Sequence, residues 1–150
     1  VSQFSRAHGL TPVLLPMQDS RDRAICAAVC SRCPGAVLLS HLSPKEIIAL
    51  LGHCELAVGM RLHLLIYALN AGTPAVGLSY DPKIDAFLQY ADMPPPLSVR
   101  DCTAGRLIEK MEQIFCDRER LTARAAEMCT ALRKKAQEDA EKAVSLLPKA

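Results

Sequence analysis

Three side chains with the chemistry to bind and protonate a small anion, Arg61, His63 and Lys83, lie in one stretch of the sequence, residues 58–83. The guanidinium of Arg61 is a planar fork that matches a carboxylate or a phosphate, and Lys83 supplies a point charge. His63 can donate or accept a proton near neutral pH. These residue types together predict a site that attracts an anion and holds an acid beside it.

Two strand-to-helix junctions would position these side chains. The apolar run 56–58 ends at Gly59, and a helix pattern follows that carries Arg61 and His63 in its first turn and ends at Gly72. The apolar run 75–78 ends before Asp81 and Pro82, which are typical of a helix start and place Lys83 in the next first turn.

Both junctions have the same physical character. A helix N-terminus presents free N–H groups and a partial positive charge, and the carboxyl ends of parallel strands face the ligand crevice. We therefore expect one anion pocket at the two junctions. The alternative is that Arg61 and Lys83 are solvated surface cations and that His63 is a buried, hydrogen-bonded histidine.

The composition sets outer bounds on the function. The chain has 150 residues, half of them hydrophobic and none of them Trp, which suffices for one domain with a sizeable core. The net charge of +2 gives no argument for nucleic acid or an anionic membrane as a partner. Apolar runs fall short of the ~20 residues that span a bilayer, so we expect no membrane span. The chain starts at Val1, so the lack of a signal sequence is uninformative.

Seven cysteines, an odd number, stand mostly within helix patterns, where a free thiol behaves as a small hydrophobe. This use of cysteine indicates a reducing compartment. We expect the protein in the cytoplasm, either free or bound peripherally at the inner face of the membrane. Cys26, Cys30 and Cys33 form a short motif without a second pair at zinc-finger spacing, and the first two fit the apolar face of a helix. We predict no metal and no cofactor.

The segments before the central stretch alternate between strand and helix. A helix end over 1–9 precedes a strand over 11–16, and the helix 19–33, capped by Asp19, precedes a strand over 36–40. The buried stripe of that helix is predicted to comprise Ala24, Ile25, Ala28 and Val29. Ser43 and Glu46 form a capping box for a helix over 42–53.

The segments after Lys83 continue the alternation. The helix runs to about Tyr90, a last strand covers 97–99, and Thr103 caps the next helix. The apolar stripe of that helix is predicted to comprise Leu107, Ile108, Met111, Ile114 and Phe115. From Asp117 onward the sequence predicts a charged helical tail, residues 117–147, with sparse apolar anchors. Those anchors are Leu121, Met128, Leu132 and Val144.

Apolar strands that alternate with helices are typical of a parallel sheet covered on both faces, so the predicted fold class is α/β and Rossmann-like. The chain contains no internal repeat and neither of the common glycine-rich phosphate motifs, G-x-G-x-x-G and G-x-x-x-x-G-K-[ST]. Any anion site must therefore use other residues.

The segments 59–68 (GMRLHLLIYA), 72–74 and 77–83 (GLSYDPK) closely resemble the polysaccharide pyruvyl transferase family, CsaB type. The resemblance is strongest over residues 36–90. It implies that residues 1–150 form the C-terminal, donor-binding half of a longer enzyme with two Rossmann-like halves, in the manner of GT-B glycosyltransferases. The N-terminal, acceptor-side half would then be a partner that this chain lacks, and we expect the chain alone to be inactive.

The resemblance also implies an activity. Family members transfer the enolpyruvyl group of phosphoenolpyruvate to two hydroxyls of one sugar, forming a cyclic pyruvate ketal and releasing phosphate. In CsaB-type proteins the sugar belongs to a cell-wall polysaccharide that anchors S-layer proteins, so the expected acceptor is such a polymer or a lipid-linked sugar. Carried onto this sequence, Arg61, the Leu62 N–H, His63 and Lys83 would bind phosphoenolpyruvate, with His63 as the catalytic acid.

Two other functions stay open at this point. One is the nucleotide-sugar-binding half of a GT-B glycosyltransferase, for which Asp81 or Asp85 would have to bind the ribose. The other is a non-enzymatic interaction module that uses the charged helix. The presence of Arg61, His63 and Lys83 together argues against the second, because a pure interaction surface does not need all three.

Overall fold

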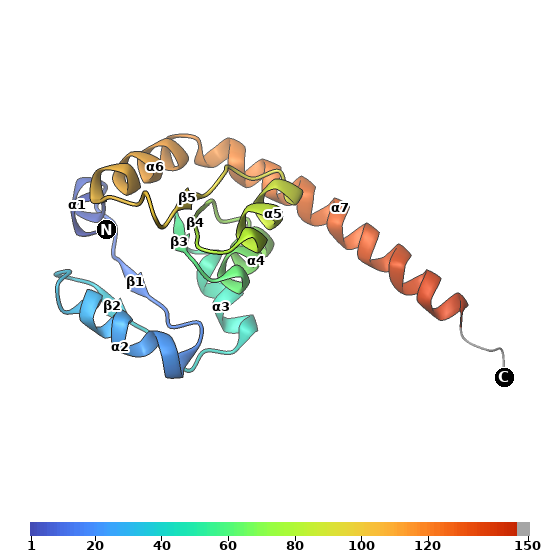
Figure 1. The fold of residues 1–150 in the computed structure, drawn as a ribbon, viewed down its shortest axis with the longest axis horizontal. Helices are drawn as coiled ribbons and strands as arrows, with labels where there is room; N and C mark the ends of the chain where they lie inside the picture. The colour runs from blue at the N-terminus through green and yellow to red at the C-terminus, as the bar shows by residue number, and fades with distance from the viewer. Residues whose placement is uncertain (147–150) are drawn as a thin grey trace.

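The structure, a computed structural model, describes residues 1–146 and contains parallel strands surrounded by helices (Figure 1). The elements in chain order are α1 (Ser2–Ala7), β1 (Val13–Leu14), α2 (Asp19–Cys30), β2 (Val37–Leu38), α3 (Pro44–Leu51), β3 (Ala57–Gly59), α4 (Leu62–Ala71), β4 (Ala75–Ser79), α5 (Pro82–Tyr90), β5 (Leu97–Ser98), α6 (Ala104–Cys116) and α7 (Arg118–Ser145). The predicted α/β class with parallel strands is confirmed.

The strands lie in two sheets instead of one. β1 pairs with β2, and β3, β4 and β5 pair in that order, all in parallel. The register between β3 and β4 places Ala57 beside Ala75 and Gly59 beside Gly77. β1 is short, and Pro12 and Pro16, which flank it, have no N–H to donate to a neighbouring strand.

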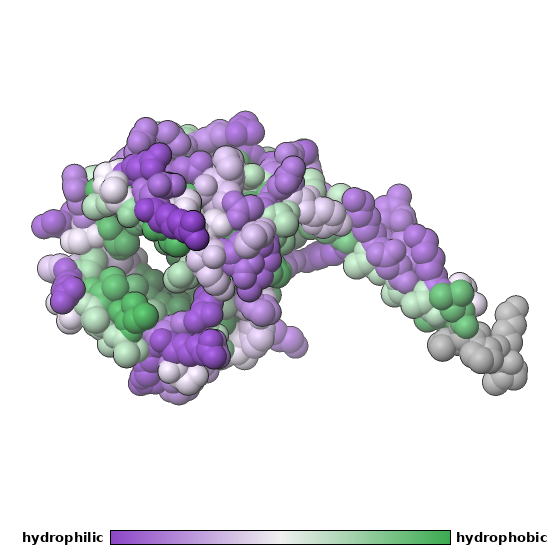
Figure 2. All heavy atoms as spheres, viewed as in Figure 1, coloured by the Kyte–Doolittle hydropathy of each residue, from purple (hydrophilic) through white to green (hydrophobic). Residues whose placement is uncertain are grey.

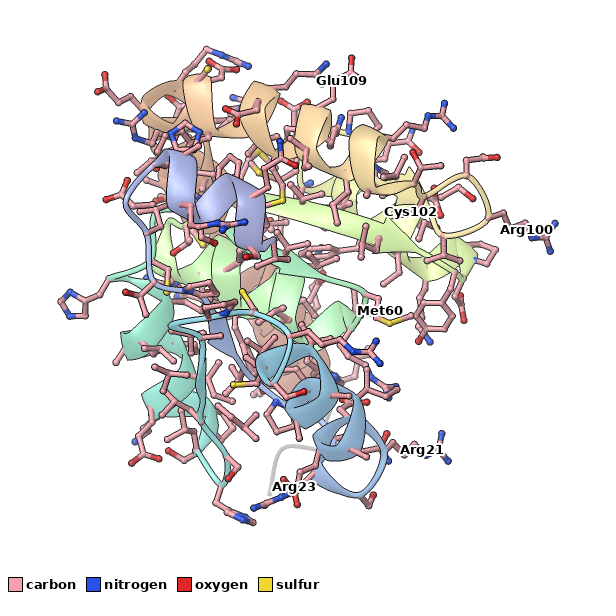
Figure 3. The ribbon with its side chains drawn as sticks, turned by 90° about the vertical axis from the view of Figure 1, so that its left-hand side faces the viewer. Arg21, Arg23, Met60, Arg100, Cys102 and Glu109 are labelled. Carbon is pink, nitrogen blue, oxygen red and sulfur yellow. The ribbon has the colours of Figure 1, made fainter. Side chains whose placement is uncertain are left out.

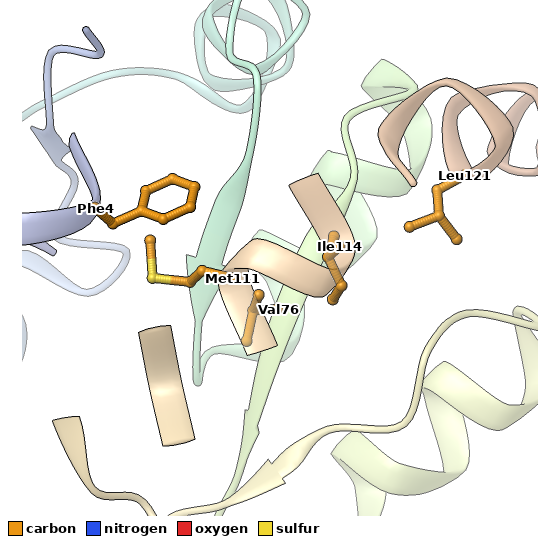
Figure 4. Close-up of a cluster of buried hydrophobic side chains, with 5 residues drawn as sticks. All are labelled: Phe4, Val76, Met111, Ile114 and Leu121. Atoms are coloured by element: carbon orange, nitrogen blue, oxygen red, sulfur yellow. The ribbon is translucent and has the colours of Figure 1, made fainter. Parts of the chain in front are cut away.

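The largest buried cluster lies where α1, α6 and the start of α7 cover one face of the three-stranded sheet. Figure 4 shows its members Phe4, Val76, Met111, Ile114 and Leu121. On α6 the predicted apolar stripe is confirmed, because Met111 and Ile114 are buried and the partly buried Leu107 and Phe115 pack against the cluster. This packing fixes β4, the strand that leads to Lys83.

A second region of packing lies on the side of the sheet covered by α3, α4 and α5. Leu65 of α4 packs with Ile84 and Leu88 of α5, and all three are almost fully buried. The predicted capping box of Ser43 and Glu46 starts α3. Helices α4 and α5 are therefore held firmly at the positions from which their first turns carry the candidate site residues.

The predicted burial of α2 is wrong. None of its residues is buried, and the four residues of the predicted stripe, Ala24, Ile25, Ala28 and Val29, are all exposed. The partly buried side of α2 carries Cys26 and Cys30 instead, and the sheet beneath it has only two short strands with which to cover the helix. Figure 2 shows hydrophobic residues gathered at the end of the molecule formed by β1, β2 and α2. The predicted cap is also wrong, since Gln18 and not Asp19 is the N-cap residue.

Helix α7 leaves the body of the protein about halfway along its length (Figure 1). Ala125 is buried, and Met128, Cys129 and Leu132 pack against Leu69 of α4 and its neighbours. Of the predicted anchors, Leu121 is buried and Val144 is exposed, so the prediction for Val144 is wrong. The predicted tail ended at residue 147, which lies outside the described residues.

Two further findings concern membranes and thiols. Within residues 1–146, no helix combines the length and the apolar character needed to cross a bilayer. All seven cysteines are free thiols.

Candidate functional site

The carboxyl ends of the strands line one edge of the molecule. β3 and β4 are neighbours and parallel, so the segment that follows Gly59 and the segment that follows Ser79 emerge side by side. Figure 3 shows this edge from the side, with Arg100 after β5, Met60 after β3 and Arg21 in the first turn of α2. The edge corresponds to the ligand-binding end of parallel α/β sheets.

Two glycines in register let the helices approach this edge closely. A Cβ atom at Gly59 would lie 2.3 Å from Leu64 Cδ2, and one at Gly77 would lie 2.5 Å from Leu88 Cδ1. Such distances are far below van der Waals contact, so a side chain at either position would force Leu64 or Leu88 to shift. The glycines therefore allow close packing of the first turn of α4 on β3 and of the last turn of α5 on β4.

Arg61 is the N-cap residue of α4 and reaches across to α2. Its Nε donates to Asp22 Oδ2 at 3.2 Å, and its Nη2 donates to Oδ1 at 2.5 Å. The side chains of Arg61 and Asp22 are 31% and 18% exposed. The hydrogen bond from Arg61 lowers the pKa of Asp22 and is the largest influence on it, and the same bond raises the pKa of Arg61.

Lys83 lies in the first turn of α5, beside the cap of that helix. Asp81 accepts a hydrogen bond from the Lys83 backbone N–H at 3.0 Å, and the Lys83 ammonium lies 3.2 Å from Asp81 Oδ2. The hydrogen bond to Asp81 raises the pKa of Lys83. The ammonium also lies 5.6 Å from the centre of the Tyr80 ring, a cation–π distance.

Tyr80 links the two cations. It contributes to the raised pKa of both Arg61 and Lys83, and its ring is the one that lies under the Lys83 ammonium. The structure thus brings Arg61 and Lys83 to one place, around a half-exposed tyrosine at the ends of β3 and β4. This arrangement places two cationic side chains at the edge, each beside a carboxylate, Asp22 for Arg61 and Asp81 for Lys83.

His63 and Leu62 occupy the first turn of α4. The His63 side chain is exposed, and its ring centre lies 6.2 Å from that of Tyr67 on the same helix. His63 is therefore not the buried histidine of the alternative interpretation. No side chain caps this end of α4, in contrast to α5, so the first N–H groups of α4 are open to a ligand.

Two residues at this site were given no role from the sequence. The sequence by itself assigns no role to Asp22, and Tyr80 stands in it only as part of the segment 77–83. The position of Tyr80 between Arg61 and Lys83 in the sequence was a usable signal. The pairing of Asp22 with Arg61 joins residues 39 positions apart and had no sequence signal.

The carboxylates that a nucleotide-sugar site would need are already engaged. Asp81 caps α5 and pairs with Lys83, and Asp85 accepts a short hydrogen bond from Ser79. Across residues 1–146, His, Cys, Asp and Glu side chains form no cluster of three or more suited to a metal ion. Hollows of about 390 and 640 Å³ lie elsewhere, beside Met93 and beside Thr73. The side chains of His63, Tyr80 and Lys83 are exposed, so the candidate site is an open edge.

The sequence model of the family described as polysaccharide pyruvyl transferase matches residues 3–82, which is more than half of the chain. A curated relative, the amylovoran biosynthesis protein AmsJ of Erwinia amylovora, is 30% identical over 91 residues. These residues are 60% of this chain and 22% of AmsJ, so the chain spans only a small part of that relative. No solved structure matches the chain.

Proposed function

Because this chain belongs to the polysaccharide pyruvyl transferase family, we propose that it supplies the donor site of a pyruvyl transferase, with phosphoenolpyruvate as the donor. Family membership suggests a transferase that acts in polysaccharide biosynthesis. The observation that supports the donor is the convergence of Arg61 and Lys83 at the carboxyl ends of two adjacent parallel strands. Phosphoenolpyruvate carries a carboxylate and a phosphate, and both need such charges.

Each residue has a proposed role in binding. The Arg61 guanidinium pairs with one anionic group, and the Lys83 ammonium pairs with the other. The uncapped N–H groups at the start of α4, that of Leu62 first, add hydrogen bonds and the positive end of the helix dipole. Both cations would also offset the charge that develops on the departing phosphate.

The proposed chemistry balances without an oxidant or a reductant. A proton adds to the methylene carbon of phosphoenolpyruvate, and C2 becomes electrophilic. One sugar hydroxyl forms a C–O bond to C2, phosphate leaves with its bridging oxygen, and the second hydroxyl closes the ketal. The two hydroxyl protons balance the new methyl hydrogen and the proton on phosphate. His63, exposed in the first turn of α4, is the proposed acid.

We also propose the class of acceptor and a second half of the enzyme that binds it. The acceptor would be a polysaccharide or its lipid-linked precursor, as in the synthesis of a cell-wall polymer that anchors S-layer proteins. AmsJ is named for amylovoran biosynthesis, which is in keeping with a polysaccharide acceptor. The open edge of the site fits a second half, arranged as in GT-B enzymes, that would supply the acceptor side. A phosphoenolpyruvate donor would place the reaction in the cytoplasm.

The test is an amide NMR titration of the chain with phosphoenolpyruvate, run beside a titration with a UDP-sugar. We expect shifts at Arg61–Leu64 and at Lys83 with phosphoenolpyruvate alone. Lys83→Ala should weaken this binding, whereas Lys45→Ala, a matched exposed lysine in the first turn of α3, should not. A selective response to the UDP-sugar would favour a glycosyltransferase, and no response to either would overturn the donor site.

The acid role needs a separate measurement of transfer. In the longest natural polypeptide that contains this sequence, His63→Ala should lower turnover about 100-fold or more, the usual contribution of a general acid. His53→Ala, at an exposed histidine beside the other ends of the strands, is the control. Normal turnover of the His63 variant would rule out the acid role.

A further inference from the structure

One contact at the candidate site joins the two sheets of the protein. Asp22 belongs to α2, which follows β1, and Arg61 belongs to the junction that follows β3. The two side chains meet in a bidentate pair, with one carboxylate oxygen on Nε and the other on Nη2. The planar match of these groups fixes the orientation of the guanidinium as well as its distance.

The carboxylate of Asp22 is itself held in place. Its Oδ2 accepts the backbone N–H of Gln18, the N-cap residue of α2, at 2.9 Å. That bond closes the first turn of α2 and leaves the side chain little freedom. With the Asp22 side chain only 18% exposed, this pair differs from the open surface pair of Asp19 with Arg23, whose members are 42% and 50% exposed.

We propose that Asp22 is the positioning residue for Arg61, and that it orients the guanidinium toward the anion that the donor site takes. The inference rests on the proposed function, because it concerns the same site. Asp22 occupies one N–H of Nε and one of Nη2, so the N–H groups of Nη1 remain for a carboxylate or a phosphate.

Two physical effects of Asp22 on anion binding have opposite signs. Its negative charge repels an anionic ligand, so removing the charge should tighten binding, and salt should weaken this effect. Its hydrogen bonds preorganise Arg61, so removing them should loosen binding because a mobile guanidinium must be ordered by the ligand. The direction of the change therefore separates a positioning residue from a mere counter-charge.

The experiment measures phosphoenolpyruvate affinity of the whole chain by isothermal titration calorimetry at physiological ionic strength. Four proteins are compared: wild type, Asp22→Asn, Arg61→Ala and the double variant. Asp19→Asn is the matched control, since Asp19 lies in the same helical turn and contacts Arg23 instead. Thermal unfolding of each protein is measured in parallel.

We expect Asp22→Asn to weaken binding about tenfold, within the range of coupling between side chains in contact. In the Arg61→Ala background the same change should not weaken binding further, because only the repulsion by Asp22 is left to remove; a general loss of structure would weaken binding in both backgrounds. Asp19→Asn should bind like wild type. If Asp22→Asn does not fold, Asp22→Glu replaces it; the longer side chain keeps the charge and displaces the carboxylate, so positioning again predicts weaker binding.

The two proposals fail in different ways. Wild type that binds phosphoenolpyruvate, together with an Asp22→Asn variant that binds it equally or more tightly, would overturn the positioning role and leave the donor site intact. An equal loss with and without Arg61 would overturn it too, because Asp22 would then act on the fold. Wild type that does not bind phosphoenolpyruvate would overturn the proposed donor site and the positioning role with it.

Discussion

Replacing Gly77 by alanine tests whether close helix approach shapes the candidate site. Gly77 lies in β4, in register with Gly59, and its φ is not positive, so alanine brings no backbone strain. The new Cβ would lie 2.5 Å from Leu88 Cδ1 and 3.3 Å from Pro96 Cβ. The destabilising effect of the substitution in the folded state is therefore steric.

The magnitude follows from how little Leu88 can move. Carbon atoms prefer a separation of about 3.5–4.0 Å, so the end of Leu88 must shift by roughly 1 Å or more. Leu88 is 2% exposed and packs against Ile84, which is fully buried. Overpacking of this kind costs about 1–3 kcal/mol, and the lower conformational entropy of alanine in the unfolded chain returns about 0.5–1 kcal/mol. We expect a net loss of about 1–2 kcal/mol.

The assay is thermal unfolding followed by circular dichroism, with urea unfolding as a second measure. For a chain of this size a loss of about 1–2 kcal/mol lowers Tm by roughly 2–8 °C. Gly105→Ala is the matched control, since Gly105 lies in α6 and a Cβ there meets no atom within 4 Å. The same chemical change should raise stability there by about 0.5 kcal/mol, because alanine favours a helix.

The steric argument fails if Gly77→Ala is as stable as wild type while Gly105→Ala is stabilised as expected. That result would mean that β4 and α5 can separate at little cost. The close packing of Leu88 on Gly77 would then not be what holds α5, the helix that carries Lys83, against β4.

Three other predictions test the fold and its electrostatics. Thr73→Val should lower the free energy of unfolding by about 1 kcal/mol, because it removes the 2.6 Å hydrogen bond from the buried Thr73 hydroxyl to the Leu51 carbonyl. The loss stays small because that carbonyl keeps a second hydrogen bond, from the Cys54 N–H. Urea unfolding checks this, with Thr73→Ser, which retains the hydroxyl and its bond, as the control. The folded-state pKa of Asp22 is lowered, so its contribution to stability is present above the ordinary value of 3.8 and is lost as the pH falls through the folded pKa. In acid unfolding curves, the stability difference between wild type and Asp22→Asn should therefore shrink below about pH 4. A difference that stays constant would contradict the pairing with Arg61. Removing residues 134–150 should change Tm by less than about 2 °C, because all side chains over 134–146 are exposed. By contrast, Leu121→Ala, at a position 4% exposed on the same helix, should lower the free energy of unfolding by about 2–5 kcal/mol.

Local signals in the sequence predicted most elements. The capping box at Ser43 and the Thr103 cap each mark a helix start that the structure confirms, because both rest on contacts between residues three apart. Gly72 ends α4 with a φ of 75°, a conformation that glycine adopts without strain. Such short-range rules do not depend on the rest of the fold.

Burial was predictable only where an element has a partner on its apolar side. The stripe of α6 is buried because α1 and β4 lie beneath it. The stripe of α2 satisfies the same sequence rule and is exposed, since only two short strands lie under that helix. Periodicity shows which side of a helix is apolar, but it does not show how much protein covers that side.

For the candidate site, the sequence by itself determined the residue types and the two junctions that carry Arg61, His63 and Lys83. It did so because strand ends, helix starts and glycines are local features. Only the tertiary structure decided that Arg61 and Lys83 meet at Tyr80, that His63 faces Tyr67, and that Asp22 holds Arg61. These contacts depend on how strands pair and how closely helices pack, which no short segment specifies.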